Sequence, residues 1–122
     1  FFYYRMENFE LVKIVPGIYK YIQIIVEKEG EDSFMVIRMR NDCEYHADIL
    51  QTFQNEEIYG VGLVEYESNC PGGGRIKFEE EEKKIFVYGY SQGFGRADHE
   101  ITIGLIKTKY PDHEVTWSNE GY

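Results

Sequence analysis

The stretch that decides the fold is GIYKYIQIIV, residues 17–26. Tyrosine, isoleucine and valine are typical of β-strands, and the Pro-Gly pair at residues 16–17 is a turn signal, so we predict a strand over residues 18–26. Successive side chains alternate between the two faces of a strand, and the even-numbered positions of this one are otherwise apolar. Lys20 therefore lies among apolar neighbours. Two interpretations stay open for it: its ammonium reaches water from the strand end, or it has a partner of its own.

The residues that follow predict a hairpin and then a helix. Gly-Glu-Asp at residues 30–32 is a turn signal, and residues 33–39 have the composition of a second strand that pairs with the first. Asn41 is a typical helix cap, and Glu44 three residues later completes the pattern of a capping box. An apolar stripe follows at helical spacing, so we predict a helix from residue 41 to about residue 59.

The second half of the chain predicts three strands, a helix and a last strand. Their expected ranges are 63–67, 75–78, 84–90, 97–110 and 115–117. Two of these strands flank the four glutamates at residues 79–82 and form a hairpin whose like charges stay in water. The resulting order is ββαβββαβ. It predicts an α+β fold in a single domain, with two helices packed on one mixed, mostly antiparallel sheet of about six strands.

Length and charge limit the classes of function. The 122 residues have the size of one domain, which we assign to residues 17–122, with residues 1–16 as an N-terminal extension. Met6 can serve as a native start, so one expectation is that the first five residues are a cloning remnant, and whether they are native stays open. The 13 basic against 22 acidic side chains give a net charge of −9, which disfavours nucleic acids and anionic membranes as partners. No run approaches the roughly 20 apolar residues of a membrane-spanning helix.

Cysteine usage indicates a reducing compartment. Cys43 and Cys70 form no CxxC motif, and no histidine stands at the spacing of a zinc site. We therefore expect neither a disulfide nor a structural metal. The expectation for the whole protein is a cytoplasmic monomer.

Two side chains near the predicted start of the first helix can carry chemistry. The dipole at a helix N-terminus disfavours the charged form of His46, which makes the neutral imidazole a usable base at pH 7. A histidine without a role is the commoner case for such a residue taken alone. Cys43, one turn earlier, is either a thiolate nucleophile or a small packing residue. His99 and His113 have no evident partners, so we expect them to be structural or exposed.

Two glycine-containing segments can present backbone N–H groups to an anion. They are residues 72–74, followed by Arg75, and residues 91–95, which begin with Ser91. Neither is a Walker loop or a dinucleotide fingerprint, and a structural turn is the commoner meaning of such segments. Three consecutive glycines lose much conformational entropy on folding, so a tight turn or a close backbone approach must require them.

Several ordered motifs together point to one family. They are YKY at 19–21, EYHADI at 44–49, CPGGGRI at 70–76, KIFVYGYS at 84–91, and the closing run from KYPD at 109–112 through EVTWSNEGY at 114–122. In this combination the chain resembles the phosphohistidine phosphatase family, also called the janus family, from about Gly17 to its end. The resemblance implies a small phosphatase that uses no metal or other cofactor. It removes phosphate from phosphohistidine, and in some cases from phospholysine, in proteins.

The resemblance also implies which residues form the site. It assigns His46 as the proton acceptor. It places the phosphate among Lys20, Ser91, Gln92 and Gly93, with the backbone near Ala47 and the side chain of Arg75 as further neighbours. His46 would take a proton from the water that attacks phosphorus, while the donors around the phosphate stabilise its oxygens. Direct attack by His46 on phosphorus stays open as the alternative.

Some residues depart from the family pattern. Asp42 and Cys43 stand where an aromatic residue and an alanine are frequent, and Gln92 stands where methionine is frequent, which leaves the choice of substrate open. A helix that began at Asn41 would also occupy the N–H of Ala47, so phosphate binding by that amide needs a start near Tyr45. Two other classes of function remain. One is a module that binds phosphorylated partners without turnover, or a regulatory member of the janus family that has lost activity. The other is a thiol redox protein that uses Cys43.

Overall fold

The computed structural model describes residues 5–6 and 8–121, so Phe1 to Tyr4 of the expected remnant lie outside the described residues. Six strands form one sheet in the order β3-β5-β4-β6-β7-β8. Their bounds are β3 Val12–Lys13, β4 Gly17–Lys28, β5 Phe34–Met39, β6 Tyr66–Glu79, β7 Lys84–Tyr88 and β8 Glu114–Trp117. Two further short strands, β1 (Arg5–Met6) and β2 (Phe9–Glu10), pair with each other.

The sheet is mixed. β5, β4, β6 and β7 pair antiparallel with their neighbours, whereas the outer pairs β3/β5 and β7/β8 are parallel. The helices are α1 (His46–Phe53), which continues as the π-helix η1 (Gln54–Tyr59), and α2 (His99–Lys109). The predicted α+β fold with two helices and a six-stranded mixed sheet is confirmed.

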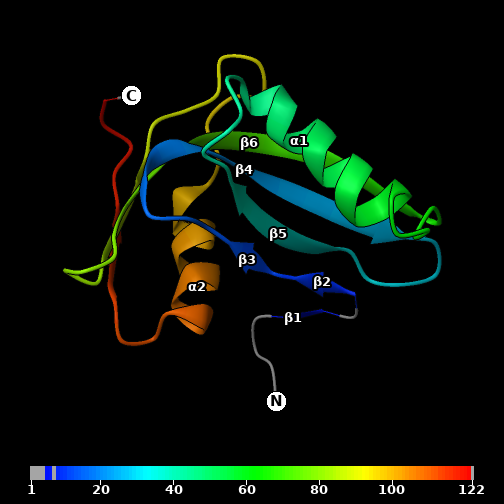
Figure 1. Ribbon diagram of the computed structural model, residues 1–122, viewed down its shortest axis with the longest axis horizontal. Helices are drawn as coiled ribbons and strands as arrows, with labels where there is room; N and C mark the ends of the chain where they lie inside the picture. Colours follow the sequence, from blue (N-terminus) through cyan, green and yellow to red (C-terminus); the bar gives the residue numbers. More distant parts are fainter. Residues whose placement is uncertain (1–4, 7, 122) are drawn as a thin grey trace.

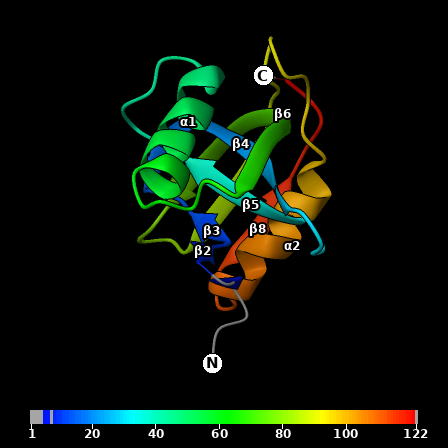
Figure 2. The same ribbon diagram turned by 90° about the vertical axis from the view of Figure 1, so that its right-hand side faces the viewer.

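The two helices cover opposite faces of the sheet, as Figures 1 and 2 show. This follows from the alternation of side chains along β4. Ile22 and Ile24 lie in the core under α1, together with Phe53, whereas Tyr21 lies in the core under α2, together with Ile106. All of these side chains are buried, so β4 is a central strand that is apolar on both sides.

The N-terminal segment contributes to the core. We expected residues 1–16 to form an extension, but Val12 and Lys13 form β3, which pairs with Ile37 and Arg38 of β5. The side chains of Phe9 and Val12 are fully buried. The sheet thus has six strands because β3 joins it.

One long strand replaces two predicted strands and the glycine loop between them. β6 runs without interruption from Tyr66 to Glu79, so residues 72–74 lie inside a strand and not in a turn. The register changes along it: Gln23 pairs with Gly72, but Ile25 pairs with Asn69. Two residues of β6, Cys70 and Pro71, therefore oppose one residue of β4, which is a β-bulge. A bulge accommodates a proline, which has no N–H to give to the ladder.

Replacing Gly104 by alanine is expected to stabilise the protein by about 0.5–1 kcal/mol, because glycine in a helix interior loses more backbone entropy on folding. Gly104 lies inside α2, and a Cβ atom there would meet nothing within 4 Å. Urea unfolding measures the change. The matched control is Gly30→Ala, where the Cβ also has space but φ is +83°. This control should destabilise the protein, and a gain equal to that of Gly104→Ala would contradict the argument.

Candidate active site

A cleft of about 400 Å³ opens between the start of α1, the strand β4 and the loop that follows β7. It is lined by Lys20, Tyr45, His46, Ala47, Ser91, Gln92, Gly93 and Phe94. Six of the seven site residues expected from the sequence thus lie in one cleft. The seventh, Arg75, does not line it but is the direct partner of Lys20 in the β4/β6 register. Segments 70 residues apart in the chain meet at this end of the sheet (Figure 1).

The first helix begins at His46, so the predicted start at Asn41 is wrong. Tyr45 is extended (φ −121°, ψ 154°), and its N–H donates to the Asp48 carboxylate at 3.0 Å. The acidic partner of the helix start is therefore Asp48 and not Glu44. Because the first N–H groups of an α-helix have no partner within the helix, Ala47 at the second helical position presents a donor at the cleft.

Asp42, which departs from the family pattern, is electrostatically compensated. Its two carboxylate oxygens each accept a hydrogen bond of 2.8 Å from the Arg40 guanidinium. This pairing lowers the pKa of Asp42 to about 2. The negative charge of Asp42 is therefore held beside Arg40 and does not oppose an anion in the cleft.

His46 is a buried imidazole of defined tautomer. Its side chain is 6% exposed, and Nε2 lies 2.9 Å from the carbonyl oxygen of Gly74. A carbonyl oxygen can only accept, so Nε2 carries the hydrogen and Nδ1 of the neutral ring keeps its lone pair. Burial lowers the pKa of His46, and the charges of Lys20 and Arg75 lower it further. His46 is thus neutral at pH 7, with a lone pair on Nδ1.

Three glycines of β6 are required by close approaches on both faces of the sheet. A Cβ atom on Gly73 would lie 2.8 Å from Cδ2 of His46, and one on Gly74 would lie 2.7 Å from Cε1 of His99. A Cβ on Gly72 would lie 2.7 Å from the backbone nitrogen of Ala97. The sequence left a tight turn and a close backbone approach open, and the close approach is what the structure contains.

The second glycine segment is a closed loop that is attached to the first. Ser91 and Gly95 exchange two backbone hydrogen bonds, of 3.0 and 2.8 Å. The Gly95 carbonyl also accepts from the N–H of Gly73 at 3.0 Å. The hydroxyl of Ser91 accepts from the N–H of Phe94 at 3.1 Å, which leaves its own hydrogen to be donated. Because the N–H groups of Ser91, Phe94 and Gly95 are used within the loop, the Ser91 hydroxyl and the amides of Gln92 and Gly93 are the groups that this segment holds at the cleft.

Lys20 lies near the start of β4 and lines the cleft. It lies on the α1 face of β4, directly across from Arg75. Among the described residues, no carboxylate forms an ion pair with its ammonium. Lys20 and Arg75 thus place two cations at or beside the cleft of an acidic protein.

Two aromatic residues that line the cleft were not among the site residues expected from the sequence. Tyr45 is 61% exposed, and Phe94 is half-buried. An exposed tyrosine at a helix start and a phenylalanine between two glycines were the available signals. Both give the cleft an apolar flank beside its donors.

The cysteines do not form a reactive pair. Cys43 and Cys70 are free thiols. Burial raises the pKa of Cys43, and it raises the pKa of Cys70 to about 11. Both stay protonated at neutral pH, and a protonated thiol is a poor nucleophile. These findings count against the thiol redox alternative.

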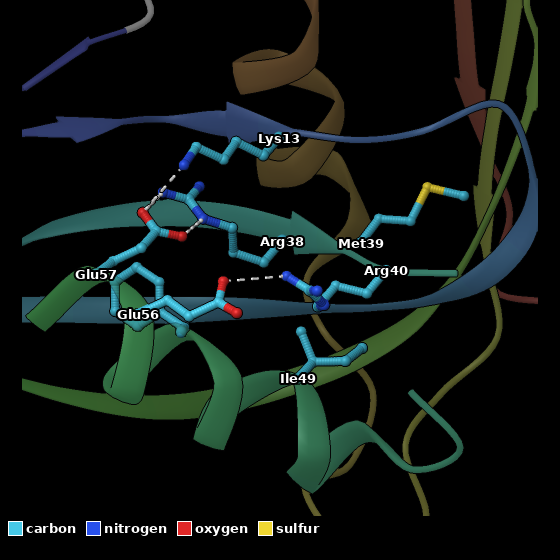
Figure 3. A pocket seen from close by; sticks show the side chains of 8 residues that line it. Lys13, Arg38, Met39, Arg40, Ile49, Glu56 and Glu57 are labelled. Carbon is cyan, nitrogen blue, oxygen red and sulfur yellow. Dashed lines mark hydrogen bonds and ion pairs between the residues drawn. The ribbon is translucent and has the colours of Figure 1, made fainter. Parts of the chain in front are cut away.

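A second pocket, of about 270 Å³, lies between β5 and the far part of the first helix (Figure 3). Its buried Arg38 donates to both carboxylate oxygens of Glu57, at 2.9 and 2.8 Å. Lys13 also pairs with Glu57 at 3.4 Å, and Arg40 pairs with Glu56 at 3.6 Å. The charges at this pocket therefore compensate one another. The ion pairs of Glu57 attach η1 to β5.

Within residues 5–6 and 8–121, no three His, Cys, Asp or Glu side chains are arranged to hold a metal ion. None of the helices described in those ranges has the length and apolar composition of a membrane span.

Lowering the pH below about 6.5 is expected to destabilise the fold. Burial lowers the pKa of His46 and of His99 from their ordinary value of 6.5. Between the folded pKa and 6.5 the unfolded chain binds more protons, so this contribution to stability is complete above pH 6.5 and is lost as the pH falls through that window. Urea unfolding between about pH 7.5 and 5 measures the slope. His46→Gln should reduce it, and a slope unchanged by that substitution would contradict the assignment.

Comparison with known proteins agrees with the resemblance seen in the sequence. A family model described as the Janus/Ocnus family matches residues 6–114. The sex-regulated protein janus-A of Drosophila melanogaster is 49% identical over 114 residues, which cover 92% of the chain and 81% of that relative. The 14 kDa phosphohistidine phosphatase of Sus scrofa is 40% identical over 112 residues, which cover 87% of the chain and 86% of that relative.

Proposed function

The chain belongs to the Janus/Ocnus family, and from this premise and the geometry of the cleft we propose that it is a protein phosphohistidine phosphatase. Its substrates would be proteins that carry phosphate on histidine, with phospholysine as a second class. The observation that carries the proposal is the state of His46. Its Nε2 is committed to the Gly74 carbonyl, which leaves the lone pair of Nδ1 on the neutral ring as a base beside the donors of the cleft.

The hydrogen-bond donors at the cleft suit the negatively charged oxygens of a phosphoryl group. Phosphoryl transfer is catalysed chiefly by positioning and by stabilising charge on the three equatorial oxygens. The Lys20 ammonium, the Ser91 hydroxyl, the amides of Gln92 and Gly93, and the first-turn amide of Ala47 come from three separate segments around one cleft. Such a cradle can hold the oxygens on several sides.

The proposed reaction is hydrolysis of the P–N bond. The oxygen of a water molecule bonds to phosphorus while Nδ1 of His46 takes a proton from that water. The P–N bond breaks, and its electron pair goes to the imidazole nitrogen of the substrate. The substrate ring carries a proton on its other nitrogen and therefore leaves as neutral imidazole, and His46 returns the proton it took from water to the solvent. The products are inorganic phosphate and histidine. The aromatic side chains of Tyr45 and Phe94 give the departing ring an apolar flank.

The same lone pair supports one alternative chemistry. If Nδ1 of His46 attacks phosphorus itself, a phosphorylated His46 forms and water hydrolyses it in a second step. Rapid quenching of a single turnover distinguishes the two, because only the second route leaves phosphate on the enzyme.

Phosphate release from a phosphohistidine peptide in the presence of EDTA tests the proposal. We expect turnover by the wild type, none with a phosphoserine peptide of the same sequence, and a KM raised roughly 10- to 100-fold by Lys20→Ala, the size of a lost charged hydrogen bond. Lys77→Ala, an exposed lysine of β6, is the matched control. Binding of the peptide without release would overturn the proposal and identify a binding module. The name of the janus-A relative states no activity, which makes that outcome a definite alternative.

We propose that the protein acts in a reducing cytosol. Its two cysteines are free thiols, which supports the reducing cytosol expected from the sequence. We propose that it acts there as a monomer. Size-exclusion chromatography with light scattering at the assay concentration tests this.

A further inference from the structure

A line of buried hydrogen bonds lies behind the cleft, on the α2 face of the sheet. It joins Gln23 and Tyr21 of β4 to Thr102 and His99 of α2 and ends at Gly89, just after β7. The four side chains are all at most 2% exposed. The reaction proposed above uses none of them.

Each hydrogen bond in this line has a defined direction. The Gln23 amide nitrogen donates to the Thr102 hydroxyl at 2.9 Å, and the Gly89 carbonyl accepts from Nε2 of His99 at 2.8 Å. His99 therefore has an unprotonated Nδ1, which must accept from the Tyr21 hydroxyl, 2.6 Å away. The Tyr21 oxygen in turn accepts from Thr102 at 2.9 Å. The line thus holds one tautomer of His99.

The line ends where the anion-binding loop begins. Gly89 has φ +76°, a left-handed turn that directs the chain from β7 toward Ser91 two residues later. The other end of the loop is fixed to Gly73, through the Gly95 carbonyl and through the N–H of Ala97 at 3.1 Å. His99 thereby holds the entry of the loop, while Gly73 holds its exit.

His99 also packs against the backbone that holds His46. A Cβ atom on Gly74 would lie 2.7 Å from Cε1 of His99, and the carbonyl of the same Gly74 accepts from His46 on the opposite face. One residue of β6 therefore separates the two imidazoles. A shift of the His99 ring would displace the loop entry and the support of His46 together.

We propose that His99 is a positioning residue for the phosphate-binding loop, acting through the hydrogen bond from its Nε2 to Gly89; this rests on the proposed function only in taking residues 91–93 as phosphate donors. Its role is to keep Ser91 and the amides of Gln92 and Gly93 in the geometry that binds the anion. Tyr21 and Thr102 hold the ring in the tautomer that this requires.

Two substitutions separate the two hydrogen bonds of His99. In His99→Gln the amide nitrogen reaches the position of Nε2, so the bond to Gly89 is kept. In His99→Asn the shorter side chain offers an oxygen near Nδ1, so the bond from Tyr21 is kept and Gly89 loses its donor. We expect His99→Asn to weaken binding of inorganic phosphate between about 10- and 100-fold, the effect of displacing a binding group by about 1 Å. His99→Gln should stay within about threefold of the wild type.

Phosphate affinity is measured by NMR titration of the backbone amides of residues 91–95, which does not require turnover. Ile106→Val, a buried substitution of α2 outside the line, is the control for lost stability and should bind phosphate like the wild type. Equal phosphate affinity in all three variants would overturn the inference and make His99 a purely structural residue. A wild type that binds phosphate but hydrolyses no phosphohistidine would overturn the proposed function alone, and these affinities would still decide the role of His99.

A measurement on the wild type covers the case in which His99→Asn does not fold. The Hε2 proton of His99 is buried and hydrogen-bonded to Gly89, so its resonance is protected from exchange. We expect saturation with phosphate to shift this resonance together with the amides of the loop. A resonance that stays in place while those amides shift would contradict the inference, and a wild type that binds no phosphate would overturn both proposals.

Discussion

Replacing His46 by glutamine is expected to lower kcat for phosphohistidine hydrolysis between about 10²- and 10⁴-fold, the usual contribution of a positioned general base. Glutamine keeps a nitrogen donor for the Gly74 carbonyl, which His46 contacts at 2.9 Å, but it offers no basic lone pair. The substitution thus removes the proton acceptor and retains the structural bond. Single-turnover and steady-state kinetics measure the loss. KM should change much less, because Lys20 and the loop still hold the phosphate.

The alanine variant of the same residue removes both the proton acceptor and the hydrogen bond to Gly74. It therefore distinguishes the catalytic role of His46 from its structural role. His46→Ala should lose kcat to the same extent and should also lose about 1–3 kcal/mol of unfolding free energy, because the buried Gly74 carbonyl is left without a donor. Urea unfolding of both variants shows the difference. If His46→Gln kept kcat within tenfold of the wild type, the ring would act only as a support for β6, and the assignment of the base would be wrong.

The site residues were assigned by the family resemblance, because each local pattern taken alone has a commoner structural meaning; six of the seven line one cleft. An imidazole at a helix start and a lysine on an apolar strand face are each visible in a few consecutive residues. No local sequence pattern gives the register between strands. The pairing of Lys20 with Arg75 and the separation of His46 from His99 by one glycine arise only when β4, β6 and two helices assemble.

The misplaced element boundaries have physical causes. Asn41 and Glu44 satisfy the pattern of a capping box, but Tyr45 is extended, and the chain turns into the helix only where Asp48 can accept the Tyr45 N–H. Glycines usually mark turns, and those of β6 are instead needed for the packing of side chains against a strand. Tertiary contacts override local preference at these glycines, whereas at the helix start one local capping pair takes the place of another.

The contacts of His99 and the burial of Phe9 and Val12 were not predicted, because their partners lie far away in the sequence. His99 had no visible partner because Tyr21 lies 78 residues away and Gly89 offers only its backbone. Phe9 and Val12 lie in a segment that we expected to be an extension, and they are fully buried because β3 adds to the edge of the sheet beside β5. Such contacts depend on which elements become neighbours, and composition does not contain that information.

Substituting alanine for Gly73 is expected to disturb fold and activity together. The new Cβ would lie 2.7 Å from the backbone oxygen of Tyr21 and 2.8 Å from Cδ2 of His46, both closer than packed atoms tolerate. The backbone pairing between β4 and β6 cannot yield easily, so the His46 ring must move from its place in the cleft. Overpacking of this kind costs about 1–3 kcal/mol, and the displaced base should lower kcat at least tenfold.

Combining Gly73→Ala with His46→Ala shows which of the two close contacts matters. Removing the ring relieves the contact at 2.8 Å but leaves the contact with the Tyr21 oxygen at 2.7 Å. The loss of stability caused by Gly73→Ala should therefore be smaller in the His46→Ala background, a coupling that a double-mutant cycle of urea unfolding measures. Gly104→Ala, remote from the cleft, should add its effect independently in either background. Strict additivity of Gly73→Ala and His46→Ala would mean that the backbone contact alone requires glycine at residue 73, and the ring would then be free to keep its position.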